Sequence, residues 1–413
     1  MDKRPRLRFY LLAFAFLLCW GLALSRGQWA QAQYRGASAR LHGGGVPHEV
    51  LGESLRQQAS KVPLPIAAWS RGGKTRLANE TTGAGCQVRP IRVYGDMEAV
   101  CPMTPLSGSL PLPGDEAGCV LDAASAWALF GSLDVVGAAV PFGGKDYVLR
   151  AVVEAKEGML LLRDKEAAYE NLELAAGSPE EAGAALSDFI FRYGLSQDYT
   201  LVEGGFYAAL LAGLLPLPGL ILAAALLFPL ARSLWRRRNL PLQALLLLCG
   251  LAAGSLALGW LLGLTPYWPA RFLPTQWSDF GFWGALFQQA GQTQEALSYL
   301  TPVPKDMALF GALKQGLLSL GAAALLAALL LRRPAGAAFT PRLWPDTLWL
   351  LLCAALPVLL LFAGGLAFLP TRGYLAALPL VFLRASFGGA WGLRRGGGPP
   401  PLPAGHSGPD GDG

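Results

Sequence analysis

The chain has 413 residues, of which 53% are hydrophobic and only 15% are charged, and its mean hydropathy is +0.37. Soluble globular proteins carry roughly 25% charged residues, so this composition excludes an ordinary soluble protein. The formal net charge of +6 is not a nucleic-acid footprint, because the basic residues flank apolar stretches instead of forming one patch within a folded segment. We therefore expect a membrane protein with the lipid bilayer, and not nucleic acid, as its surroundings.

The first apolar stretch, residues 9–25, follows a short basic segment at residues 1–8. It is longer than the core of a usual cleaved signal peptide, and no cleavage site of small residues directly follows it, the nearest being Ala30–Ala32. We interpret it as an uncleaved transmembrane anchor, with a cleaved signal peptide as the alternative. Either interpretation sends the following residues out of the cytoplasm.

Residues 26–205 hold most of the acidic residues and are typical of one folded, extracytoplasmic domain. Its sequence changes between helical spacing and short runs of branched and aromatic residues that predict strands. Ser178–Pro179 is expected to supply the cap and first turn of a helix. Strands and helices without strict alternation predict an α+β domain. The expected helices are 48–59 and 180–193, and the expected strands are 65–69, 88–93, 147–153 and 159–162.

Residues 206–391 predict an α-helical transmembrane bundle. Crossing a bilayer takes roughly 20 apolar residues, and several runs reach that length. A weaker candidate, 374–391, is interrupted by Arg384, so with the anchor we expect five or six helices. Pro216 and Pro218 predict a bend inside the first span of the bundle. The four clear spans after the domain are 206–231, 242–264, 309–331 and 346–369.

The basic residues also predict how the chain crosses the membrane, since Lys and Arg are enriched in cytoplasmic loops. The N-terminus is then cytoplasmic, and the aromatic-rich loop 265–308 lies outside with the folded domain. Within that loop, residues 281–300 predict a helix that lies on the membrane surface or against the outer domain. The Gly- and Pro-rich residues 392–413 predict a disordered tail. We expect a multi-pass protein of the cytoplasmic membrane.

No motif indicates catalysis or a bound cofactor. Gly72–Thr75 resembles the end of a phosphate-binding loop, but Ala68 stands where that loop needs its first glycine, and a turn is the better interpretation. Gly143–Asp146 similarly predicts a hairpin turn. The three histidines are not spaced as metal ligands. We expect no catalytic residue, cofactor or metal site, and no enzyme activity.

Two further features concern cysteine and intramembrane charge. Cys86, Cys101 and Cys119 lie in the outer domain, so at most one disulfide forms there and one thiol remains.

Arg384 lies within an apolar segment, where a charge is costly and indicates function by default. It either acts within the bundle or shows that 374–391 lies at the membrane interface.

The stretch from Cys119 to Val153 resembles the MacB-type periplasmic core domain of ABC transporter permeases. In that family a strand ends in an acidic or polar residue, a helix closes on Leu-Phe-Gly, and an Asp-x-Val-Gly turn leads to a hairpin and a Tyr-x-Val strand. A left-handed glycine that ends the helix, and a glycine that permits the following turn, explain the pattern physically. The matching residues are Leu129, Phe130, Gly131, Asp134, Gly137 and Tyr147.

The resemblance implies a permease subunit that couples a separate cytoplasmic ABC ATPase, with or without a second permease subunit, to the outer domain. The bundle departs from the family, which has three helices after the outer domain and a longer cytoplasmic segment. The basic loops are then the only surfaces suited to the ATPase. The alternative is a membrane-anchored accessory or sensor protein without an ATPase partner. The contact residues that we expect are Arg232, Arg236, Arg237, Arg238, Arg332 and Arg333.

Overall fold

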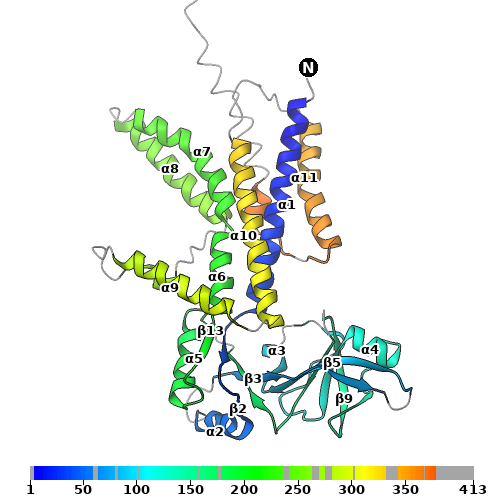
Figure 1. Cartoon of the computed structure of the whole chain (residues 1–413). Helices are drawn as coiled ribbons and strands as arrows, with labels where there is room; N and C mark the ends of the chain where they lie inside the picture. The colour runs from blue at the N-terminus through cyan, green and yellow to red at the C-terminus, as the bar shows by residue number, and fades with distance from the viewer. Residues whose placement is uncertain are drawn as a thin grey trace, which may run out of the picture. The chain divides into compact units, whose positions relative to one another are not determined.

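The computed structural model describes residues 4–58, 64–79, 82–100, 103, 105–155, 158–174, 178–236, 241–262, 269–274, 281–300, 303–331, 343–366 and 368–377. The chain divides into two compact units, shown in Figure 1. The sheet unit comprises Arg26–Leu214 and Pro266–Gly316, and the helical unit comprises Met1–Ser25, Leu215–Thr265 and Leu317–Gly413. Helices α1 (Arg4–Gln33) and α10 (Pro304–Leu331) each contribute residues to both units.

The sheet unit is built on a mixed sheet whose strand order is β13-β1-β12-β3-β5-β10-β7-β9-β6, with β4 paired to β5 and β8 to β9. The β10–β5 and β7–β9 pairs are parallel, and the others in the sheet are antiparallel. Strands β2 and β11 form a separate pair. The mixed sheet and its helices confirm the predicted α+β class. The strands are β1 (Ala37–Leu41), β2 (Val46–Pro47), β3 (Ile66–Arg71), β4 (Thr75–Ala78), β5 (Gly85–Tyr94), β6 (Pro105–Gly108), β7 (Gly118–Asp122), β8 (Ala139–Phe142), β9 (Lys145–Val153), β10 (Met159–Leu162), β11 (Ala168–Tyr169), β12 (Asn171–Leu174) and β13 (Tyr199–Val202).

The helices of the sheet unit agree with most of the sequence-based expectations. The predicted helix 48–59 is α2, and 180–193 is α5. Glu180 occupies the N-cap position of α5 without a side-chain cap, and the backbone carbonyl of Ser178 accepts hydrogen bonds from the N–H groups of Glu181 and Ala182. The sheet-unit helices are α2 (His48–Gln58), α3 (Met97–Val100), α4 (Ala123–Phe130), α5 (Glu181–Arg192), α6 (Gly204–Leu214), the short 3₁₀ helix η1 (Ala270–Phe272) and α9 (Gly281–Ser298).

Both faces of the central strands are buried, which period-two alternation makes possible. Leu121 of β7 packs in a core with α4, while its neighbour Val120 packs on the opposite face with Met97 and Val100 of α3. A third core joins α5 to β1 and β12 at the other end of the sheet. The sheet is therefore held by helices on both faces.

The stretch that resembles the MacB-type domain forms a capped helix. Asp122, fully buried, ends β7 and caps α4, because its Oδ2 accepts from the backbone N of Ser125 at 3.0 Å. Its Oδ1 accepts from the backbone N of Met159 on β10 at 2.7 Å. Gly131 ends the helix in the left-handed region, with φ of 69°. One carboxylate thus joins a strand, a helix and a neighbouring strand.

The helical unit contains the remaining apolar helices. They are α7 (Leu217–Arg236), α8 (Pro241–Leu262) and α11 (Leu343–Ala363), with the first part of α1 and the second part of α10. The indole N–H of Trp20 on α1 donates to the carbonyl of Leu215 at 2.9 Å, and the ring of Tyr10 stacks on Trp349 of α11. Large side chains such as Phe228 and Leu256 stay exposed. An apolar outer surface of this kind suits a lipid environment.

In the described residues, four helices are long and apolar enough to cross a membrane: Leu7–Gln33, Gly204–Arg236, Pro241–Trp260 and Pro304–Leu331. α11 contributes a shorter apolar stretch, Leu351–Ala363, and residues 378–391 of the weak sixth candidate lie outside the described residues. The total of five or six spans is not confirmed. At Pro216, where the sequence predicts a bend, a turn at residues 215–216 interrupts the helix and separates α6 from α7.

We predict that Asp122→Ala destabilises the sheet unit by about 2–4 kcal/mol, since it removes a helix cap and leaves the buried N–H of Met159 without its acceptor. Asp122→Asn should cost roughly half as much, because the amide keeps one acceptor oxygen. Thermal unfolding of the full chain in mild detergent measures both. Equal, small losses for the two variants would contradict the double role of the carboxylate.

Candidate functional site

Four charged side chains meet in the interior of the sheet unit, and they form the candidate functional site. Arg40 comes from β1, Glu173 from β12, and Lys305 and Asp306 from the first turn of α10. Each side chain is at most 10% exposed. Two positive and two negative charges balance, so the cluster is neutral as a whole. We call these four residues the charge cluster.

Strand register places the sheet half of the charge cluster. Ser38 lies directly opposite Glu173 on the neighbouring strand, and Arg40 is two residues further along β1 on the same face. Trp69 projects from β3 toward the same carboxylate. The side chains of the two strands alternate, so the charged residues share one face and the apolar residues of β1 and β12 pack in the core on the other face.

Glu173 uses both carboxylate oxygens fully. Its Oε1 accepts from Nη1 of Arg40 at 2.7 Å and from the indole N–H of Trp69 at 2.9 Å. Its Oε2 accepts from Nζ of Lys305 at 2.7 Å and from the hydroxyl of Ser38. Four donors around one buried carboxylate compensate for the water that it has lost.

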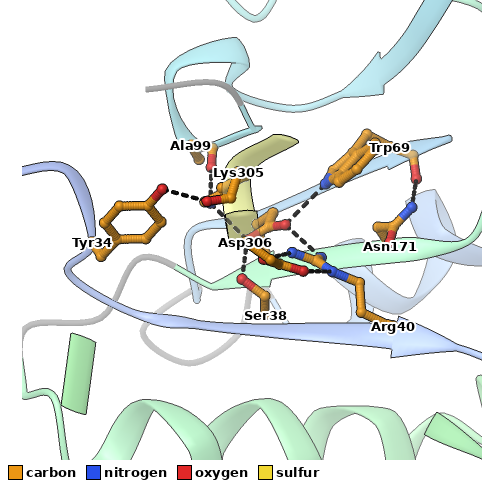
Figure 2. A network of polar contacts seen from close by, with 9 residues as sticks. Tyr34, Ser38, Arg40, Trp69, Ala99, Asn171, Lys305 and Asp306 are labelled. Carbon is orange, nitrogen blue, oxygen red and sulfur yellow. Dashed lines mark hydrogen bonds and ion pairs between the residues drawn. The ribbon is translucent and has the colours of Figure 1, made fainter. Parts of the chain in front are cut away.

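Asp306 forms a bidentate ion pair with Arg40. Nε and Nη2 of Arg40 donate to the two carboxylate oxygens at 3.0 and 2.7 Å, and Figure 2 shows the two groups facing each other. Such fork-to-fork geometry fixes orientation as well as distance. Asp306 also lies in the first turn of α10, where a negative charge is favourable. The pair therefore joins β1 to the start of α10.

Two further hydrogen bonds hold the start of α10 at the sheet. Nζ of Lys305 also donates to the carbonyl of Ala99 on α3. The hydroxyl of Tyr34, just beyond α1, donates to the carbonyl of Lys305 at 2.5 Å, as Figure 2 shows. The first turn of α10 thus contacts two strands, a helix and the chain that enters β1.

The pKa values of the buried pair show the electrostatic balance. Burial alone would raise the pKa of Glu173, but the positive charges of Arg40 and Lys305 outweigh it and lower the pKa to about 2. Burial alone would likewise lower the pKa of Arg40, but the Glu173 and Asp306 carboxylates raise it above its usual value. Both groups stay ionised, so the contact is ionic throughout the physiological pH range.

A second, partly exposed contact lies beside the first. Arg271 of η1 donates through Nη1 and Nη2 to the two oxygens of Glu203, at 2.7 and 3.0 Å, and its guanidinium lies 3.6 Å above the ring of Phe206. Glu203 stands between β13 and α6. This pair ties the segment before α9 to the start of α6.

The residues that resemble the MacB-type pattern lie in a hydrophobic core or at turns. Leu129, Phe130 and Tyr147 pack in one core, and Gly131 and Gly137 take positive φ values of 69° and 93°. Asp134 is exposed on the turn between them. Gly143 and Gly144 form the predicted hairpin turn, and Gly72 to Lys74 connect β3 to β4.

The expected ATPase-contact residues are only partly described. Arg232 and Arg236 are exposed in the last turns of α7. The structure does not describe Arg237, Arg238, Arg332, Arg333 or Arg384, and it does not describe Cys101 or the tail 392–413.

Cys86 and Cys119 are free thiols. Within the described part, no group of three His, Cys, Asp or Glu side chains is placed to hold a metal ion.

The sequence analysis missed the charge cluster. Lys305 and Asp306 precede the apolar run at 309–331, so they were assigned to a loop, whereas α10 begins at Pro304. Arg40 and Glu173 lie in strands that were not predicted. The available signal was a single charge in each of two otherwise uncharged short runs, Ala37–Leu41 and Asn171–Leu174.

No family model matches the chain, and no curated protein matches it. Among solved structures, it is similar to the periplasmic region of MacB from Actinobacillus actinomycetemcomitans, at 10% identity and a TM-score of 0.35, over 42% of this chain and 90% of that one. It is also similar to the extracellular domain of the noncanonic ABC-type transporter YknZ from Gram-positive bacteria, at 14% identity and a TM-score of 0.30, over 40% and 99%. TM-scores this low carry no argument about function.

We predict that Glu173→Gln removes a pH-dependent part of the stability. Because the folded pKa lies below the ordinary carboxyl value of about 4.3, ionised Glu173 stabilises the fold above that pH, by about 3 kcal/mol. This contribution is lost as pH falls from about 5 to about 2. Thermal unfolding midpoints across this range should therefore fall more steeply for the unsubstituted chain than for the variant.

The matched control for this measurement is Glu49→Gln, which changes an exposed carboxylate on α2. Its pH profile should follow that of the unsubstituted chain. If Glu173→Gln also leaves the profile unchanged, Glu173 is not held ionised by Arg40 and Lys305.

Proposed function

We propose that this protein is a membrane-spanning permease subunit of an ABC-type transporter or mechanotransmission complex. In this proposal a separate cytoplasmic ATPase, with or without a second permease subunit, moves the transmembrane helices. The sheet unit lies outside the cytoplasm and acts on an exported substrate or on the cell envelope. The chain itself makes and breaks no covalent bond.

The observation that carries the proposal is the charge cluster. A helix that enters a membrane usually begins in a surface loop, but α10 begins with two charged residues buried in the sheet unit. Its continuation to Leu331 is apolar and long enough to span a bilayer. A displacement of α10 along its axis would therefore pull on β1 and β12 directly. Transmission of force needs a connection of this kind.

The first turn of α6 has a similarly close connection to the sheet. The backbone N–H of Gly205 donates to the carbonyl of Gly36 at 2.8 Å. A Cβ atom on Gly205 would lie only 2.9 Å from the carbonyl carbon of Arg35. Together with the Arg271–Glu203 pair, this backbone contact holds a second candidate membrane-spanning helix against the start of β1.

The basic residues at the end of α7 and directly after it support the position that the proposal gives to the ATPase. Arg232 and Arg236 are exposed, and Arg237 and Arg238 follow them directly in sequence. If the positive-inside rule holds, this segment faces the cytoplasm. The exposed guanidinium groups of this segment could then pair with acidic residues of the ATPase, and such surface pairs avoid the desolvation cost of a buried ion pair.

We predict that a nucleotide-binding subunit copurifies with the full chain from its native membrane in mild detergent. Replacing Arg232, Arg236, Arg237 and Arg238 by Glu should remove that subunit, because like charges would then face each other. Photocrosslinking of the purified complex to labelled ATP, followed by electrophoresis, measures the bound ATPase.

Arg56→Glu is the control, since it reverses an exposed charge on α2 of the sheet unit and should leave the ATPase bound. Absence of any ATP-labelled partner from the unsubstituted chain would reject the permease proposal. The accessory or sensor alternative would then stand.

A further inference from the structure

Helix α9 has an uncharged, aromatic first half that the protein does not cover. The helix contains only one charged residue, Glu295, near its end, and none of its residues is buried. Trp283 is 43% exposed and Phe287, one turn later, is 74% exposed. Residues four apart share a helix face, so these two rings form one exposed aromatic surface.

The other end of α9 is attached to the sheet unit. Leu297, and Leu300 just after the helix, pack against a core that contains Val202 of β13 and Leu309 of α10. Ala30 of α1 and Ala208 of α6 belong to the same core. The end of α9 is therefore fixed where three membrane-entering helices come together.

The direction of α9 differs from that of its neighbours. Figure 1 shows α9 running crosswise to α6 and α10 within the sheet unit. α6 and α10 begin the candidate spans Gly204–Arg236 and Pro304–Leu331. A helix that leaves the entry point of such spans at a large angle runs along the membrane surface.

We propose that the first half of α9 lies in the lipid–water interface of the outer leaflet, with Trp283 and Phe287 in contact with lipid. Trp and Phe favour this zone, and an interfacial helix buries such a face at the boundary between headgroups and acyl chains. Gln288 and Gln289 end this half, and Gln292 and Gln294 keep the second half in water. The first half of α9 has no Lys or Arg that could bind anionic headgroups. Burial of its apolar side chains therefore holds it in the interface, and anionic lipid is not needed.

Fluorescence quenching on the full chain tests this proposal. A variant in which the six native cysteines are replaced carries one environment-sensitive fluorophore, at Phe287→Cys or at Gln292→Cys. The chain is placed in phosphatidylcholine nanodiscs, with or without phosphatidylglycerol. The quenchers are a nitroxide lipid labelled near the headgroup and aqueous iodide.

The label at residue 287 should lose fluorescence to the nitroxide lipid and be shielded from iodide, equally in both lipid compositions. The label at residue 292 should show the opposite pattern. If iodide quenches both labels alike and the nitroxide lipid neither, α9 lies in water. If neither quencher reaches residue 287, protein covers it. Either result overturns the proposal, provided that each labelled chain unfolds at the same temperature as its unlabelled parent.

Discussion

The structure depends on the neutrality of the charge cluster. A single charge in a protein interior is costly, and breaking a buried ion pair by removing one partner typically costs about 3–5 kcal/mol. Here Arg40, Glu173, Lys305 and Asp306 balance one another, and the carboxylate of Glu173 alone accepts four hydrogen bonds. The four side chains must therefore be buried together. This requirement determines where α10 begins and how it meets β1 and β12.

Among the described residues, the chain passes between the two units within α1, within α10 and at the end of α6. α10 is one continuous helix from the charge cluster to Leu331, and it contains residues of both units. The path through α6 and α7 is instead interrupted by the turn at residues 215–216, where one unit gives way to the other. α1 is likewise one continuous helix across the division, whereas α6 and α7 are separate helices.

Local patterns predicted much of the fold. Branched residues at Met159–Leu162 gave a strand with those limits, and helical spacing gave α2 and α5 to within a residue or two. Asp122 and Gly131 carry the signals of a helix start and a helix end, and the structure uses both. Strands β1 and β12 were missed because short runs rich in Ala, or containing a charge, have weak strand propensity.

The candidate site could not be predicted in the same way. Arg40 and Asp306 are 266 residues apart, so only the folded sheet brings them together. A charge beside an apolar run normally marks the end of a membrane span, and Lys305–Asp306 fits that rule equally well. The sequence shows that these charges exist, but the partner of each depends on strand order and register. Burial of the whole cluster is a tertiary property.

The most direct test of the central claim is hydrogen exchange of the full chain in nanodiscs, with peptides that cover Met307–Phe310 of α10 and Ala37–Leu41 of β1. If the charge cluster joins them, residues 307–310, which directly follow the cluster in α10, should exchange as slowly as the strand. Under conditions where the opened structure recloses more slowly than its amides exchange, both peptides should then exchange together in one cooperative step. Rapid exchange at 307–310 beside a fully protected β1 would show that α10 begins as a frayed helix end, and that the sheet is not coupled to it.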